Sequence, residues 1–226
     1  MKYQILYRDA FPLLECQLGP GETVRAESDA MVAMSPTLEI NGALKGSVLG
    51  GLARKMLAGE SFFFQEVAAT KGSGQVLFAP ALPGAIHDLQ LNGSYGLRVQ
   101  KNGYLASTCN INVSTAVQNL AQGLFSRAGL FVLGINGTGT VFLSSYGAVH
   151  RIDLAAGEEV VIDNGHLVAW VDTMDYKIEK ASNGWMSSIM SGECLVCRFR
   201  GPGFILIQTR NPSALGAWVR GIVSKG

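Results

Sequence analysis

The cysteine pair Cys194 and Cys197, with two residues between them, is the feature of this chain that most suggests chemistry. Two cysteines at this spacing supply half of a structural zinc site, which also needs a second pair of cysteines or histidines. The neighbouring sequence has no such pair. Residues i and i+3 of a strand also point to opposite faces, so the two sulfurs would not share one ion. We therefore expect core packing here and no metal site.

The histidines are the next candidates for acid–base or metal chemistry. His87 and His150 occupy equivalent positions of an internal repeat, and Leu14 stands there in the first copy. Because this position accepts leucine, we interpret it as a strand position near a boundary between copies; a polar patch shared between copies is the open alternative. His166 lies beside a turn and is expected to face solvent. A cupin-like metal centre would need a His-x-His pair with a carboxylate, which the sequence lacks.

The glycine-rich segments 46–51 and 134–139 lack the Lys-Ser/Thr of a phosphate-binding loop and the strand-to-helix context of a dinucleotide site. No Gly-x-Ser-x-Gly nucleophile elbow is present either. The adjacent acids Glu158 and Glu159 fall in a repeated turn, where solvation accounts for them. We therefore predict no catalytic, cofactor-binding or metal-binding residue, no cofactor and no enzymatic activity.

The aromatic and basic residues do not form a nucleic-acid surface. Phe62, Phe63 and Phe64 are consecutive, so on a strand they alternate between core and interface. RNA-stacking surfaces interleave aromatic residues with Lys and Arg, whereas Gln65 and Glu66 follow here. The net charge is only +1 and the basic residues are scattered, so we do not expect a nucleic-acid partner.

The composition has few charges, 15% of residues against an ordinary share of about 25%. Because 48% of residues are apolar, part of the apolar excess is expected to face partner subunits. No apolar run approaches the length of about 20 residues that a membrane span needs. Residues 1–11 do not resemble a secretory signal, and four cysteines do not suggest a disulfide framework. We expect a cytoplasmic protein without a membrane span.

An internal repeat organises the chain. The segment that begins at Leu18 aligns without a gap with the segment at Leu91, and a third copy begins at Leu154. Matching positions include Val24 with Leu97 and Val160, Val32 with Leu105, and Ala33 with Ala169. We therefore predict three tandem β units, residues 1–83, 84–146 and 147–226.

Each unit is predicted to consist mainly of strands. Apolar residues alternate around Val24, Leu97 and Val160, which is the period of a half-buried strand. The Asn-Gly pairs at 102–103 and 164–165 favour tight hairpins with positive φ. The near-continuous apolar runs at 76–78 and 204–207 suit strands covered on both faces.

Short helices are expected between the two halves of each unit. Ser114 is a candidate N-cap for a helix with an apolar stripe that runs from Val117 to Phe125, and the equivalents are residues 48–57 and 185–190. The predicted fold class is thus all-β: three tandem β-sandwich or short double-stranded β-helix units, with a pseudo-threefold repeat and a few short helices.

Three segments carry a resemblance to a known family: Leu-x-x-Gly-Glu-x-Val at 18–24 and 154–160, residues 46–61, and Gly-Pro-Gly-Phe-Ile-Leu at 201–206. Together they resemble the bacterial branch of the altered inheritance of mitochondria protein twenty-four family, over nearly the whole chain. The resemblance implies three units similar to the tryptophan RNA-binding attenuation protein, assembled into trimers that form a ring. It supplies no catalytic residues. The inner-membrane role of mitochondrial members is not expected here, because no transit peptide is evident.

Two functions remain open. The leading hypothesis is a non-enzymatic oligomeric scaffold or interaction protein, a homo-oligomer with the trimer favoured. The alternative is a ring that binds a small molecule between adjacent β units. A protein partner and a small ligand both stay open as partners.

Overall fold

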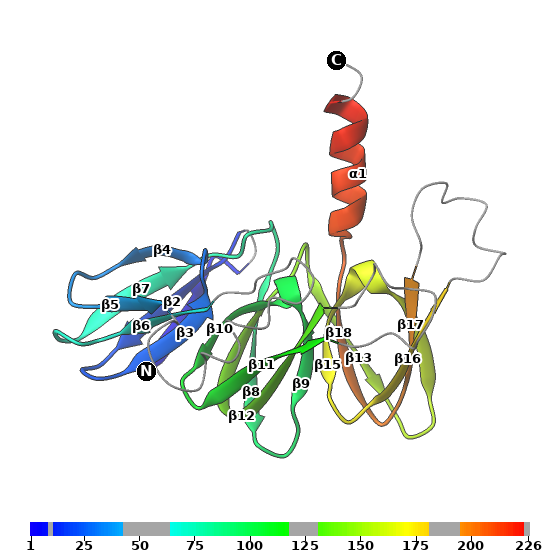
Figure 1. The fold of residues 1–226 in the computed structure, drawn as a ribbon, viewed down its shortest axis with the longest axis horizontal. Helices are drawn as coiled ribbons and strands as arrows, with labels where there is room; N and C mark the ends of the chain where they lie inside the picture. Colours follow the sequence, from blue (N-terminus) through cyan, green and yellow to red (C-terminus); the bar gives the residue numbers. More distant parts are fainter. Residues whose placement is uncertain (9–10, 43–63, 118–130, 181–194, 224–226) are drawn as a thin grey trace.

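The computed structural model describes residues 1–8, 11–42, 64–117, 131–180 and 195–223. Within these ranges the chain is all-β apart from short 3-10 turns and one α-helix, which confirms the predicted class. Figure 1 shows the strands in three groups that lie in a row, coloured blue to cyan, green, and yellow to orange along the chain. We call these groups the N-terminal segment (residues 2–78), the middle segment (86–144) and the C-terminal segment (149–208).

The N-terminal segment has two layers of antiparallel strands. Its strands are β1 (Lys2–Leu6), β2 (Leu13–Leu18), β3 (Thr23–Glu27), β4 (Met31–Met34), β5 (Glu39–Gly42), β6 (Phe64–Ala68) and β7 (Gly74–Phe78). One layer has the order β1-β2-β7-β4, and in the other β6 lies between β3 and β5. Alternate residues of both layers, such as Cys16 and Phe78 from the first and Val24 and Val67 from the second, are buried in one apolar cluster.

The middle segment uses one long strand in both of its layers. Its strands are β8 (Ile86–Asn92), β9 (Leu97–Gln100), β10 (Tyr104–Thr108), β11 (Ile111–Val117) and β12 (Phe131–Ser144). The first half of β12 lies between β9 and β11, and its second half lies between β8 and β10. The strand crosses between the layers at Gly137 and Gly139, which both have positive φ. A Cβ at Gly137 would overlap the carbonyl oxygen of Asn110, so glycine is required at this crossing.

The C-terminal segment again has two layers. Its strands are β13 (Val149–Leu154), β14 (Glu159–Asp163), β15 (Leu167–Val171), β16 (Asp175–Lys180), β17 (Leu195–Arg200) and β18 (Gly203–Gln208). In one layer β18 lies between β13 and β15, and in the other β17 lies between β14 and β16. Trp170, Phe199 and Ile205 are fully buried here, in a cluster that continues into the middle segment.

Two strand pairs join the segments. β10 of the middle segment pairs antiparallel with β3 of the N-terminal segment, and β15 of the C-terminal segment pairs antiparallel with β9 of the middle segment. Because β12 runs through both layers of the middle segment, these junctions unite both of those layers with one layer from each of the other two segments in a sheet of eleven strands. The T-shaped contact of Phe64 with Tyr104, whose ring centroids are 5.5 Å apart, adds an aromatic link between the first two segments.

The strand pairing differs from the hairpins that the sequence predicts. Residues 101–103 and 164–166 form the 3-10 turns η2 (Lys101–Gly103) and η3 (Asn164–His166), and neither Gly103 nor Gly165 has positive φ. Each turn leads from one layer into the other: β9 and β10 pair with opposite halves of β12, and β14 and β15 pair with different strands. The later strands β17 and β18 likewise do not pair with each other. At a corner between layers the chain bends without folding back on itself, so the two strands beside the corner do not form a hairpin. The hairpin prediction is therefore wrong.

The helix predictions also need correction. Ser114 lies inside strand β11, so it does not cap a helix. Val117, at the start of the expected apolar stripe, is also part of β11. Residues 118–125 of that expected helix, and its equivalents at 48–57 and 185–190, lie outside the described residues. The one α-helix that the structure describes is α1 (Pro212–Val223), which projects from the row of strands (Figure 1). Asn211 caps it, because its Oδ1 accepts hydrogen bonds from the backbone N–H of Ser213 and of Ala214.

Candidate functional site

The described cysteines divide into two buried thiols and one exposed thiol. Cys197 lies on β17 and is fully buried, as expected for a core residue, whereas Cys194 lies outside the described residues. Burial raises the pKa of the Cys197 thiol to about 12, and burial on β2 does the same for Cys16. Cys109 is exposed. Among the described residues no three His, Cys, Asp or Glu side chains lie close enough to hold a metal ion.

Thiol labelling should follow this division. A short pulse of iodoacetamide on the folded protein is expected to modify Cys109 and to leave Cys16 and Cys197 unmodified, because the reagent needs an accessible thiolate. Peptide mapping by mass spectrometry measures each site separately, and the same pulse in denaturant is the control. Rapid modification of Cys16 or Cys197 in the folded state would contradict the burial of β2 or β17.

The three histidines lie on separate strands or turns and share no site. His87 on β8 is half-buried, and burial lowers the pKa of its imidazole below the ordinary value. His150 on β13 is exposed, and Leu14, at the matching position of β2, is fully buried. The solvent-facing prediction for His166 is wrong. Its ring is half-buried, and Nδ1 lies 2.7 Å from the carbonyl oxygen of Gln208, so the imidazole fastens turn η3 to the end of β18.

The acids of the repeated turns have a structural role. The Glu22 carboxylate accepts a hydrogen bond of 2.7 Å from the backbone N–H of Gly19, and Glu158 does the same at 2.7 Å for Ala155. In both turns the glycine before the glutamate has positive φ, 78° at Gly21 and 85° at Gly157. The Leu-x-x-Gly-Glu pattern therefore encodes a turn between layers, with the glutamate closing it.

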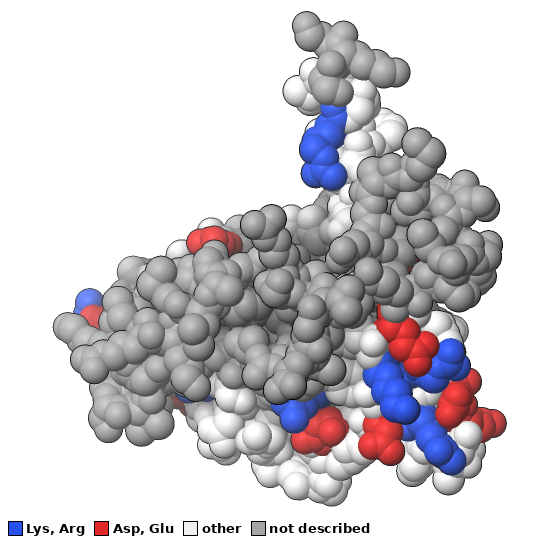
Figure 2. Space-filling view, turned by 45° about the vertical axis from the view of Figure 1, so that its right-hand side comes forward, with Lys and Arg blue, Asp and Glu red and all other residues white. Residues whose placement is uncertain are grey.

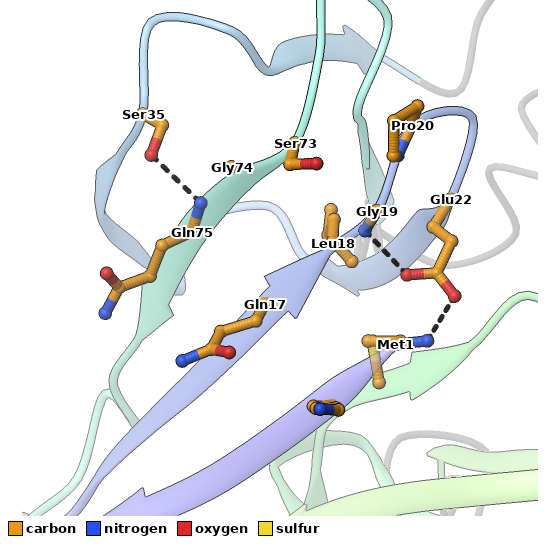
Figure 3. A pocket seen from close by; sticks show the side chains of 11 residues that line it. Met1, Gln17, Leu18, Gly19, Pro20, Glu22, Ser35, Ser73, Gly74 and Gln75 are labelled. Atoms are coloured by element: carbon orange, nitrogen blue, oxygen red, sulfur yellow. Dashed lines mark hydrogen bonds and ion pairs between the residues drawn. The ribbon is translucent and has the colours of Figure 1, made fainter.

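An open hollow of about 810 Å³ lies beside the first of these turns. Figure 3 shows the Glu22 carboxylate between the backbone nitrogen of Gly19 and the α-amino group of Met1, with which it forms an ion pair. Hydrogen bonding to that amino group is the main cause that lowers the pKa of Glu22. On the other side, Ser35 accepts a hydrogen bond of 2.9 Å from the backbone N–H of Gln75. These polar groups satisfy one another, so they hold the turn and β4 in place.

Other sequence candidates are structural as well. Phe64 is buried, while Phe62 and Phe63 lie outside the described residues. Residues 134–139 belong to strand β12, where the glycines permit the crossing between layers, and residues 46–51 lie outside the described residues. Figure 2 shows Lys and Arg side chains intermixed with Asp and Glu over its right-hand end. Arg198 contributes by pairing with Glu159 at 3.6 Å and with Glu179 at 3.3 Å. Intermixed signs do not make a phosphate-binding surface.

Two of the open sheet edges, those of β4 and β14, are the remaining feature of interest. Among the described strands β4 pairs only with β7, and β14 pairs only with β17, so each presents one unpaired side. Both carry exposed apolar side chains: Val32 and Met34 on β4, and Val161 on β14. The apolar residues of β4 and β14 alone do not distinguish these edges from paired strands. Val161 is the available signal, because its aligned positions are Arg25 and Arg98.

Helix α1 is exposed along its length, and none of its residues is buried. Its apolar face includes Trp218, Val219 and Ile222. No helix in the described part of the chain has both the length and the apolar character that crossing a membrane requires.

Comparison with known proteins identifies relatives over nearly the whole chain. The model of a family described as mitochondrial biogenesis AIM24 matches residues 3–210. An uncharacterized protein of Streptococcus pyogenes serotype M6 is 35% identical over 218 residues, which cover 93% of this chain and 86% of that protein. The crystal structure of another Streptococcus pyogenes protein superposes with a TM-score of 0.80 at 33% identity, covering 98% of this chain and 99% of that one.

Proposed function

The chain belongs to the AIM24 family, and on that premise we propose that it is a non-enzymatic oligomeric scaffold built from three copies of one β unit. The proposal has three parts: the internal repeat, the absence of catalysis, and self-assembly. The exposed apolar edges of β4 and β14 carry it. Such edges template pairing with another chain, and monomeric proteins normally protect them with charges, prolines or covering elements.

Strand pairing supports the repeat. We call the turn between β2 and β3, and its equivalents between β8 and β9 and between β13 and β14, the first turn; the second turn joins β3 to β4, β9 to β10 and β14 to β15. In each segment the strand before the first turn, the strand after the second turn and the last strand make one layer, with β1 as an additional strand in the N-terminal segment. The other strands make the second layer, and in the middle segment β12 contributes its first half to the second layer and its second half to the first. The central strands of the first layer are β7, the second half of β12, and β18. The central strands of the second layer are β6, the first half of β12, and β17. The same order in all three segments favours units at 1–83, 84–146 and 147–226.

The non-enzymatic part rests on how the described polar groups are used. Glu22 and Glu158 close turns, His166 fastens β18, and Cys16 and Cys197 fill cores with thiols that stay protonated. Acid–base catalysis would instead bring an acid, a base and a reacting group within hydrogen-bond reach of one another. A scaffold needs none of these and depends on its surfaces.

Native mass spectrometry of gently purified protein tests the proposal. At micromolar concentration we expect a homo-oligomer, with a trimer as the favoured state. A monomer would overturn the scaffold. An oligomer that carries an additional non-protein mass would favour the ring that binds a small molecule over a pure scaffold.

A further inference from the structure

We propose that copies of this chain join head to tail, with β4 of one copy pairing antiparallel with β14 of the next. The inference rests on the proposed scaffold function and deepens it, because it names the two surfaces, their occupant and their register. The occupant is a second copy of this chain. Junctions of the same kind already join the segments within one copy.

Each internal junction joins the same two kinds of strand. β10, the strand after the second turn of the middle segment, pairs with β3, the strand after the first turn of the N-terminal segment. β15 and β9 repeat this relation one segment later. By the same rule the strand after the second turn of the N-terminal segment is β4, and the strand after the first turn of the C-terminal segment is β14. Among the described strands that follow a first or a second turn, β4 and β14 lack a partner strand from another segment.

The register at this missing junction follows from the other two. Each strand after a second turn has an irregularity in its pairing at one place, between Met31 and Ala33 in β4, between Tyr104 and Ala106 in β10, and between Leu167 and Ala169 in β15. Ala33, Ala106 and Ala169 are therefore equivalent, in agreement with the sequence repeat. The observed junctions pair Ala106 with Ala26 and Ala169 with Val99. Transferred to the open edges, they predict the pairs Ala33–Ile162, Met34–Val161 and Ser35–Val160.

Exposure at β4 has the pattern expected of a junction without its partner. Leu105 is 0% exposed and Val168 is 1% exposed, whereas Val32 at the equivalent position is 55% exposed. Leu105 is buried because it packs in the same cluster as Val24 and Ala26 across the β10–β3 junction. Val32 is placed to pack in the same way against the C-terminal segment of a neighbouring copy.

The facing side chains are also complementary. Met34 and Val161 are 36% and 47% exposed, and the predicted register sets them directly opposite each other. Directly opposed residues of an antiparallel pair lie on the same face with their Cβ atoms about 4.5–5.5 Å apart. At the internal junctions this position holds an arginine, Arg25 opposite Ser107 and Arg98 opposite Trp170. In the C-terminal segment the equivalent residue is Val161, whose apolar side chain can pack against Met34.

One copy does not satisfy both edges by itself. β4 lies at one end of the row in Figure 1, and β17, the partner of β14, lies at the other end. An interface between different surfaces of two copies is heterologous, so repeated copies close into a ring or extend as a filament. In a ring and within a filament, β4 of one copy pairs with β14 of a neighbouring copy.

Opposite charges at the predicted pair test the inference. M34D and V161K each place one charge in the apolar junction, and each is expected to raise the dissociation constant of the assembly about 100-fold. The double variant M34D/V161K places the two charges opposite each other in every junction, so it is expected to restore assembly. Sedimentation velocity of the full chain at micromolar concentration measures the oligomeric state.

The matched control is I40D. Ile40 is 38% exposed on β5, an edge strand that the proposed junction does not use, so this variant should assemble as the wild type does. Thermal melting of every variant confirms folding. An assembled wild type with assembled M34D and V161K variants would overturn the β4–β14 junction and leave the scaffold intact. Dissociation of both single variants without recovery in the double variant would overturn the register. A monomeric wild type would overturn both proposals.

Discussion

Replacing Ile205 with aspartate is expected to abolish the folded state. Ile205 lies at the centre of β18, is fully buried, and pairs with Ile152 on one side and Trp170 on the other. A carboxyl group there would lose its hydration without gaining a hydrogen-bond partner, which places the loss above about 4 kcal/mol of the free energy of unfolding. Many domains have only about 5–15 kcal/mol in total. Far-ultraviolet circular dichroism during a thermal melt checks this.

The control for size at this position is Ile205→Val, which should cost only about 0.5–1.5 kcal/mol. Leu77→Asp is a second comparison. Leu77 on β7 belongs to an apolar run expected to be covered on both faces, yet it is half-buried and lies opposite Glu15. Its aspartate variant should remain folded with a lowered melting temperature. A cooperative melt of Ile205→Asp near the wild-type temperature would contradict the assignment of β18 to the core.

Replacing Trp170 with alanine is expected to cost about 3–5 kcal/mol of the free energy of unfolding. Trp170 on β15 is fully buried, and its ring makes T-shaped contacts with Tyr176 and Phe199 at centroid distances of 5.1 and 5.4 Å. It also lies opposite Arg98 at the junction with β9. Alanine would leave a cavity between β15 and the layer that contains β16 and β17, so the two layers of the C-terminal segment would lose packing against each other. Urea titration followed by circular dichroism measures the loss.

Trp170→Phe separates ring packing from the polar group. The indole Nε1 is buried and has no hydrogen-bond partner among the described residues. Phenylalanine keeps part of the ring contact and removes this unpaired N–H, whose burial is costly. The expected loss is therefore only about 1–2 kcal/mol. Equal losses for the two variants would mean that the aromatic contacts contribute little.

Strand positions were largely predictable from the sequence, but strand partners were not. The alternation of apolar residues around Val24, Leu97 and Val160 correctly indicates β3, β9 and β14, because side-chain period depends only on local backbone geometry. The Asn-Gly pairs predict hairpins, whereas residues 101–103 and 164–166 turn corners between layers. The turn propensity of a short segment does not predict which distant strand pairs with the strands beside that turn. Helix α1 was missed, although Asn211 followed by Pro212 is a recognisable start signal.

At the candidate site, too, features set by neighbouring residues were predictable and features set by distant residues were not. Burial of Cys197 could be expected from its position on an apolar strand, and the turn role of Glu158 followed from the repeat. The contact of His166 with the Gln208 carbonyl could not, because the two residues are far apart in sequence and meet through folding. The exposure of Val32 and Met34 could not be expected either, because the equivalent residues of β10 and β15 are buried.

The sequence by itself determined the all-β class, the positions of most strands and the family, because apolar period, glycine turns and short motifs are properties of neighbouring residues. The tertiary structure alone decided which strands pair and which edges stay open. β4 matches β10 and β15 in the sequence repeat, and it differs from them in pairing with no strand of another segment among the described residues. Whether an apolar side chain is core or surface depends on what covers it, and that covering comes from residues distant in the chain.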